Sequence, residues 1–145
     1  LVLRGTPLAE MWQNREFTPW SLEQVLDELP AALLALWGRG IPVIRMGLAP
    51  QPGLEHEILA GPAHPALGQR LRSLALCRFI SDKLSAAGGT SLSLKVPKRF
   101  QGEFFGHRGK LKPIYAGLGL PPEKISWCDE EYFTLADSDS RVEQG

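Results

Sequence analysis

A glycine–X–X–glycine tetrapeptide at Gly106–Gly109 is the part of the sequence best suited to bind a phosphate chain. Glycine lets the backbone approach a ligand closely, and the free amides at the start of a helix attract anions. Between residues 95 and 112 the only acidic residue is Glu103. The basic residues of this window are Lys95, Lys98, Arg99, Arg108, Lys110 and Lys112. The whole chain has no net charge, with 16 basic and 16 acidic residues, yet this window predicts a local anion-binding patch.

The same tetrapeptide has a purely structural interpretation. A GxxG sequence between two short helices is also a tight turn, and lysines and arginines beside a turn are commonly a solvated face. The sequence therefore leaves two hypotheses open for this region, namely a nucleic-acid contact or a packing role for another domain.

A second candidate set lies nearer the N-terminus. Arg45 stands inside the apolar run Ile41–Leu48, where a charge is costly unless it is paired or lines a cavity. Arg4 and Thr6 follow the apolar residues Leu1–Leu3, and active sites of β/α barrels gather at the carboxyl ends of strands. All three are therefore candidate ligand-binding residues. The alternatives are a structural salt bridge, a surface ion pair and a turn hydroxyl.

Metal binding is not predicted from the sequence. The two cysteines, Cys77 and Cys128, are far apart and form no CxxC pair. This pattern argues against a disulfide framework and suits a reducing cytoplasm. His56 and His64 have no further candidate ligands at metal spacing. No apolar run is long enough to span a bilayer, so no membrane partner is expected.

Three elements are predicted to position the N-terminal candidates. Leu1–Leu3 reads as a strand, and a helix begins after Ser21, which forms a capping box with Gln24, and ends at Gly38. Ile41–Leu48 has the length and apolar character of a strand buried on both faces of a parallel sheet. Strand, helix and strand make a βαβ unit with a right-handed crossover.

The rest of the pattern predicts a small mixed domain after a connection rich in Pro and Gly. Apolar spacing at the helical period indicates helices, and alternation indicates strands. The predicted elements are a connection over 52–64, a helix from Pro65 to Gly88–Gly89, a strand over 92–96, a short helix over 99–105, a helix over 111–118, one or two strands over 124–135 with a turn at 129–131, and a polar tail over 137–145.

The stretches Leu1–Leu8, Gly40–Leu48 and Ala60–Gly68 resemble the end of the partial barrel of radical S-adenosylmethionine (radical SAM) proteins, in the branch that includes the catalytic subunit of Elongator. The resemblance implies a [4Fe–4S] cluster held by a CxxxCxxC loop. This sequence lacks that loop, so the cluster and S-adenosylmethionine are expected in an N-terminal part of the parent protein, and this chain alone is expected to be inactive. The residues that would touch S-adenosylmethionine or substrate are Arg45, Arg4 and Thr6.

The segment Val96–Ile114 resembles the core of a KH domain, an RNA-binding module. The apolar pair Phe104–Phe105 and the tetrapeptide Gly106–Gly109 fall where the KH pattern asks, whereas Pro113 is unexpected. KH loops clamp about four nucleotides. The resemblance implies RNA, with tRNA as the best-motivated partner. The implied contact residues are Gly106, His107, Arg108, Gly109, Lys110, Lys112, Lys98 and Arg99.

The sequence thus predicts an α/β fold in two parts. Residues 1–51 form a βαβ piece of a partial (β/α) barrel, and the connection 52–64 leads to an accessory α+β domain over 65–136. This domain has a KH-like βααβ core at about 92–128, and 137–145 is a frayed tail. The predicted function is a non-catalytic C-terminal portion of a cytoplasmic radical SAM protein, which completes the barrel and helps to bind RNA. Two alternatives stay open: a purely structural or protein-interaction domain, and a free-standing RNA-binding protein.

Overall fold

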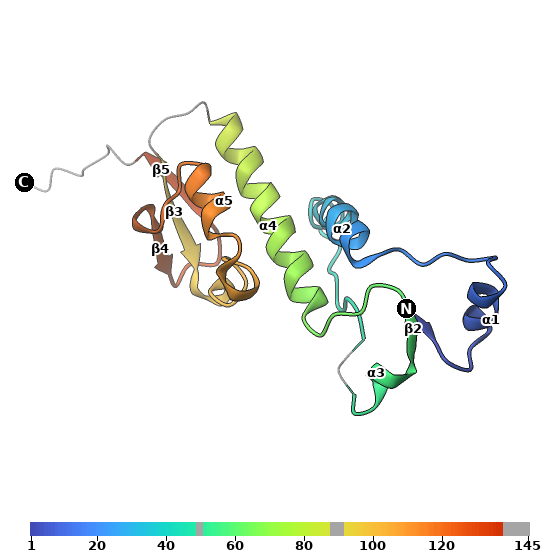
Figure 1. Ribbon diagram of the computed structural model, residues 1–145. Helices are drawn as coiled ribbons and strands as arrows, with labels where there is room; N and C mark the ends of the chain where they lie inside the picture. The colour runs from blue at the N-terminus through green and yellow to red at the C-terminus, as the bar shows by residue number, and fades with distance from the viewer. Residues whose placement is uncertain (49–50, 88–91, 138–145) are drawn as a thin grey trace, which may run out of the picture. The chain divides into compact units, whose positions relative to one another are not determined.

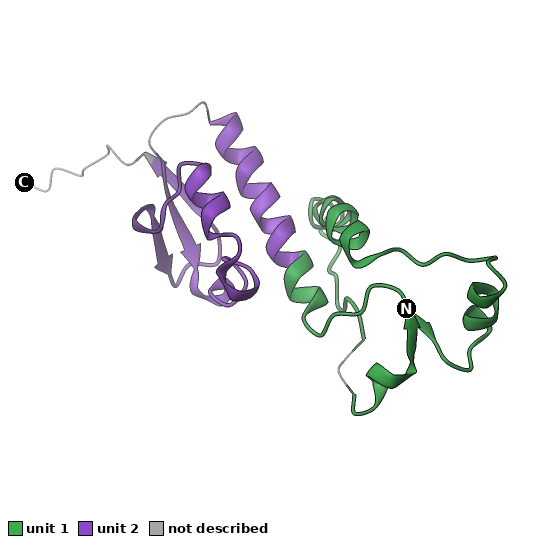
Figure 2. Cartoon of the chain, viewed as in Figure 1, with its two compact units in different colours: residues 1–71 green, residues 72–145 purple. Residues whose placement is uncertain are grey.

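The computed structural model divides the chain into two compact units, shown in separate colours in Figure 2. Unit 1 is Leu1–Leu71 and unit 2 is Arg72–Gly145. The division falls inside helix α4 (Leu67–Ala86), which is labelled in Figure 1 and drawn in two colours in Figure 2, whereas the sequence pattern predicted a boundary in the connection before this helix. In the part of the chain that the structure describes, no helix is long and apolar enough to cross a membrane. The described residues are 1–48, 51–87 and 92–137, so the predicted helix end at Gly88–Gly89 and the tail after residue 137 lie outside them.

Unit 1 contains a short antiparallel strand pair. Strand β1 (Val2–Leu3) pairs with β2 (Ile58–Ala60), so the strand predicted at the start of the chain is confirmed. The sequence analysis did not predict α1 or the ordered elements inside the connection 52–64. The helices of the unit are α1 (Pro7–Gln13), α2 (Leu22–Trp37), α3 (Leu54–Glu57) and the beginning of α4.

Helix α2 begins at the predicted capping box. The Ser21 amide donates to Gln24 Oε1 at 2.8 Å, and the Gln24 amide donates to Ser21 Oγ at 3.1 Å. Its buried residues are Val25, Pro30 and Leu33, which lie on the predicted apolar stripe or beside it. The helix and both of its predicted ends are confirmed.

The strand predicted over Ile41–Leu48 is wrong for this chain. These residues form no strand, and Ile44 is 97% exposed. A parallel inner strand needs a hydrogen-bonded neighbour on each side. Among the described residues β1 pairs antiparallel with β2 instead, and no strand lies beside 41–48. The predicted βαβ unit is therefore not formed, and Arg45 is exposed in a segment without regular secondary structure.

Unit 2 is organised by a three-stranded mixed sheet. Its central strand is β3 (Leu92–Pro97), which pairs parallel with β4 (Ile125–Cys128) and antiparallel with β5 (Thr134–Asp137). The predicted strand over 92–96 is confirmed, and the one or two strands predicted over 124–135 are two strands, β4 and β5, on opposite sides of β3. Because β3 and β4 are parallel, the chain between them must cross over, and this crossover contains the GxxG tetrapeptide.

The first half of this crossover differs from the prediction. A helix was expected over 99–105, but the structure has one turn of 3-10 helix at Lys98–Phe100 followed by hydrogen-bonded turns. So short a helix is marginal by itself, and Gly102 lowers its propensity further. The second predicted helix is confirmed as α5 (Lys112–Gly117), with Pro113 in its first turn.

The core of unit 2 lies between the sheet and its helices, and Figure 1 shows α4 and α5 beside the strands. Helix α4 contributes the predicted stripe around Cys77 and Ile80, and β3 contributes Leu94 and Val96. The crossover adds Phe104, Leu111, Tyr115 and Leu120. The crossover is therefore anchored to the core at several points, which fixes the path of the GxxG loop.

Candidate nucleic-acid interface

The GxxG loop requires glycine at its first position for two independent reasons. Gly106 has φ 70° and ψ 175°, a region that is essentially restricted to glycine. A Cβ atom at Gly106 would also lie 2.9 Å from Leu111 Cγ. The last position, Gly109, has φ 71°, which also favours glycine. The glycine pattern in the sequence therefore reflects a real backbone requirement.

Arg108 has an unusual backbone for a residue with a side chain. Its φ of 55° and ψ of 27° place it in the left-handed helical region, and its side chain is exposed. This conformation costs about 1–2 kcal/mol for a residue other than glycine. Strained residues of this kind cluster at functional sites, and backbone of alternating handedness can form concave sets of amides that bind anions. The sequence pattern carried no signal of this strain.

Two of the predicted RNA contacts are already engaged by the turn between β4 and β5. Lys98 Nζ lies 2.9 Å from the Asp129 carboxylate. Arg99 donates to the backbone carbonyl of Glu131 and stands over the Phe100 ring, 5.1 Å from its centroid. These contacts do not test RNA binding, but they mean that a phosphate would compete for both cations.

The other predicted cations have no carboxylate partner among the described residues. Arg108, Lys110 and Lys112 are exposed, and they follow one another within and just after the loop. Lys112 Nζ lies 5.3 Å from the centroid of the Phe105 ring. His107 is half-buried and already takes part in an interaction. The loop therefore presents three cations that an anion could reach without displacing a carboxylate.

An ion pair that the sequence analysis missed fixes the chain just before the loop. Arg72 Nε on α4 lies 2.9 Å from Glu103 Oε2, and the Glu103 carbonyl accepts the Gly106 amide at 2.8 Å. The Phe105 carbonyl accepts the Leu111 amide at 2.9 Å and so closes the loop. The sequence feature that could have indicated this ion pair is that Glu103 is the single acidic residue in the basic window 95–112.

Aromatic packing beneath the loop is part of the core. Phe104 stacks on Tyr115 with ring centroids 4.3 Å apart, and it meets Trp127 edge-on at 5.8 Å. Phe104 is fully buried, so it is a core residue rather than an exposed stacking platform. Burial raises the pKa of the Tyr115 phenol and of its neighbour, the Cys77 thiol. Both groups therefore stay protonated and serve packing.

The three N-terminal candidates do not gather at one site. Thr6 caps α1, because its Oγ1 donates to the Leu3 carbonyl at 2.7 Å and accepts the Ala9 amide at 3.3 Å. Arg4 is exposed, and its amide donates to the Glu57 carbonyl at 2.8 Å. Together with the exposed Arg45, these residues lie outside the lining of the cavity in unit 1. A role of any of them toward S-adenosylmethionine stays a prediction.

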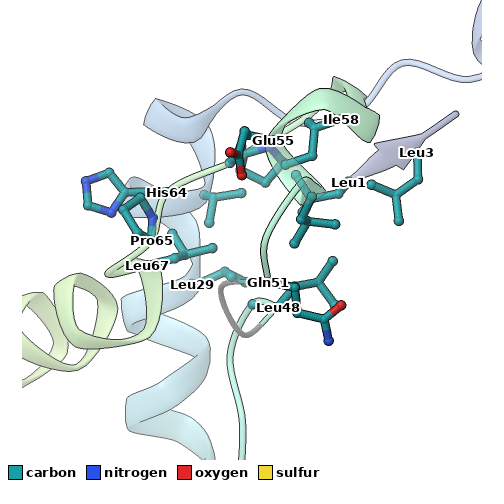
Figure 3. Close-up of a pocket in the computed structure, with 15 residues that line it drawn as sticks. Leu1, Leu3, Leu29, Leu48, Gln51, Glu55, Ile58, His64, Pro65 and Leu67 are labelled. Carbon is teal, nitrogen blue, oxygen red and sulfur yellow. The ribbon is translucent and has the colours of Figure 1, made fainter.

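That cavity is a feature the sequence analysis did not foresee. It has a volume of about 650 Å³, and Figure 3 shows its leucine-rich wall. Gln51, Glu55 and His64 supply polar groups, and His64 Nδ1 accepts the Ala66 amide at 3.0 Å. His64 thus lies just before α4 and also forms part of the lining. The apolar lining includes Leu1, Leu3, Leu29, Leu48, Ile58 and Leu67.

Comparison with known proteins assigns the first half of the chain. The family model described as the Radical_SAM C-terminal domain matches residues 1–74, about half of the 145-residue chain. The chain belongs to this family. No curated protein and no solved structure matches it. The matched range nearly coincides with unit 1. The family match makes the chain a C-terminal part of a radical SAM protein. The Elongator-like branch and the KH-like core stay predictions.

Membership of this family implies a [4Fe–4S] cluster and S-adenosylmethionine in the parent protein. The cysteines of this chain do not fit the cluster. Cys77 is buried in the core of unit 2, and Cys128 lies on β4. Within the described ranges no three His, Cys, Asp or Glu side chains are grouped to hold a metal ion. No chemical step at the cluster is therefore assigned to residues of this chain.

Proposed function

We propose that this chain completes the barrel of a radical SAM protein of the Elongator-like branch and holds its RNA substrate through the Gly106–Gly109 loop. The observation that carries the RNA part is the loop itself. It has a left-handed arginine, two glycines at positive φ and three cations without a carboxylate partner among the described residues. Backbone amides and cations of this kind hold phosphate oxygens.

The exposed apolar segment Ile41–Leu48 supports the docking part of the proposal. Ile41 and Leu48 are about half exposed, and Ile44 is 97% exposed. An exposed run of apolar residues of strand length can be covered by pairing with another sheet. In the parent protein this segment adds to the sheet of the radical SAM core. Arg45 then leaves solvent and faces S-adenosylmethionine or substrate, whereas the Thr6 hydroxyl keeps its place in the cap of α1.

The contact with RNA is electrostatic in this proposal. Each cation that meets a phosphate releases a counterion, so affinity falls as salt rises. Three cations at the loop correspond to a slope of about −2 in the logarithm of affinity against the logarithm of salt concentration, at about −0.7 per phosphate of a single strand. A looped or unpaired stretch of tRNA is the substrate to test first, because KH-like clamps act on single strands.

A second candidate function is a structural or protein-interaction domain without nucleic-acid binding. The observation that favours it is the packing of Gly106 against Leu111, which would demand glycine even in a loop that binds nothing. The engagement of Lys98 and Arg99 by the β4–β5 turn points the same way.

The deciding experiment is a titration of the chain with labelled tRNA at about 50 mM and about 200 mM salt. The test variant is His107→Asp with Arg108→Asp. A matched control is Asn14→Asp with Arg15→Asp, which makes the same charge change at an exposed pair in unit 1, where Arg15 also has positive φ. Salt-sensitive binding that survives in the control and is lost in the folded test variant supports the proposal. Equal binding by all three proteins would mean that the loop is a structural turn and that RNA binds elsewhere on the chain. Binding by none of them would leave the structural candidate.

A further inference from the structure

The turn between β4 and β5 is an acidic counterpart to the beginning of the crossover. Asp129, Glu130 and Glu131 follow one another at this turn and are all exposed. Asp129 pairs with Lys98, and the Glu131 carbonyl accepts from Arg99. The acidic turn, Asp129–Glu131, therefore neutralises Lys98 with a carboxylate and holds Arg99 through a backbone carbonyl. The cations of the GxxG loop have no carboxylate partner in the described residues.

The exposure of this ion pair argues against a mainly structural role. The Lys98 side chain is 57% exposed and that of Asp129 is 85% exposed. Ion pairs in such solvated positions contribute little to stability. An exposed pair is also easily exchanged, because a phosphate oxygen offers an ammonium group the same kind of partner as a carboxylate oxygen does.

Lys98 and the GxxG loop can meet one RNA strand because the chain between them is tightly turned. The Gln101 amide donates to the Lys98 carbonyl, the Glu103 amide to the Phe100 carbonyl, and the Gly106 amide to the Glu103 carbonyl. Each such turn brings residues three apart to within about 7 Å. A single strand of about ten nucleotides, within the range of known binding sites, is long enough to span this distance.

We propose that the acidic turn is an electrostatic gate on the RNA site, in which Asp129 holds Lys98 out of the phosphate contacts. This inference rests on the proposed RNA-binding function. It predicts a basal footprint carried by Arg108, Lys110 and Lys112, and a latent contact at Lys98.

The test is the salt dependence of binding to a labelled single-stranded RNA of about ten nucleotides. With three phosphate contacts, affinity should fall about 18-fold between about 50 and about 200 mM salt. Asp129→Asn releases Lys98 as a fourth contact, and the fall should become about 50-fold. Glu130→Gln makes the same charge change on the same turn without touching Lys98, so its salt dependence should match that of the parent chain.

A double-mutant comparison separates the gate from general electrostatics. The steeper salt dependence of Asp129→Asn should vanish when Lys98→Ala is combined with it. Equal gains in affinity with and without Lys98, or from Glu130→Gln as well, would overturn the gate.

The binding results that would refute the proposed function differ from those that would refute only the gate. If the loop variant His107→Asp with Arg108→Asp binds this RNA as well as the parent chain does, or if the parent chain and Asp129→Asn both fail to bind, RNA recognition at the loop and the gate are refuted together. If the loop variant loses binding while Asp129→Asn behaves like Glu130→Gln, only the gate is refuted. Circular dichroism confirms that each variant is folded.

Discussion

Replacing Arg108 with glycine should weaken RNA binding and stabilise unit 2 at the same time. At φ 55° and ψ 27°, the present residue bears a cost of about 1–2 kcal/mol that glycine does not. The greater conformational freedom of glycine in the unfolded chain reduces this gain in stability by about 0.4–1 kcal/mol. The free energy of unfolding should therefore rise by about 0.8 kcal/mol. For a domain of this size such a gain raises the melting temperature by about 3–6 °C.

The same substitution removes one cation from the loop. Loss of one phosphate contact should flatten the salt dependence of RNA binding by about 0.7 in slope. Arg108→Ala removes the same charge but keeps the left-handed strain, because alanine has a Cβ atom. Arg108→Ala and Arg108→Gly should thus bind RNA equally weakly, and the glycine variant should be the more stable of the two.

Arg15 supplies the matched control. It is exposed and has φ 64°, so Arg15→Gly removes one positive charge and one strained backbone in unit 1. It should gain similar stability and leave RNA binding unchanged. Urea denaturation followed by tryptophan fluorescence measures the stability, since Trp127 lies in unit 2 and Trp12, Trp20 and Trp37 lie in unit 1.

Two outcomes would refute this reasoning. If Arg108→Gly retains the full affinity and salt dependence of the parent chain, the strained arginine has no part in binding RNA. If Arg108→Gly is less stable than Arg108→Ala, the left-handed conformation of the loop is wrong. Either result would return the GxxG tetrapeptide to the role of a turn.

Further predictions concern the packing of unit 2. Gly106→Ala should lower the free energy of unfolding by about 1–3 kcal/mol in urea denaturation, because of its backbone conformation and the contact with Leu111. Gly102→Ala, which meets nothing within 4 Å, should cost far less, and equal losses would contradict the assigned geometry. Burial raises the pKa of the Cys77 thiol above its ordinary value of 9.0. The contribution of this thiol to the free energy of unfolding should therefore be complete below pH 9.0 and should decline at higher pH, because the thiol ionises first in the unfolded chain. Urea denaturation at about pH 7 and about pH 10 measures the decline, and Cys77→Ala should reduce it; an unchanged decline would contradict the prediction.

The elements that local patterns specify were predictable from the sequence. Helix α2 follows from Ser21, Gln24 and an apolar stripe, all of which act within a few residues of one another. The strands β3 and β4 and helix α5 follow from alternation and helical spacing in the same way. The glycines of the GxxG motif have positive φ, a requirement that restricts residue type and is therefore visible in the sequence, whereas their contact with RNA stays a prediction.

Partner choice was not predictable in the same way. Ile41–Leu48 has the composition of a buried strand, but a strand exists only where a second strand pairs with it. The short helix over 99–105 failed for a related reason, since so few residues form a helix only when packing supports them. The match to the Radical_SAM C-terminal domain includes residues 41–48. In the docking proposal, the sheet of the radical SAM core provides the neighbouring strand that this segment lacks here.

The sequence by itself determined the helix caps, the glycines of the loop and the local excess of positive charge, since each depends on residues that are close along the chain. Tertiary structure decided which of those charges are available. Lys98 and Arg99 come from the end of β3, whereas their partners come from the turn after β4, about 30 residues later in the chain. The pairing of Arg72 with Glu103 and the left-handed turn at Arg108 likewise depend on folding, because ion pairs and strain are settled by packing between elements distant in sequence.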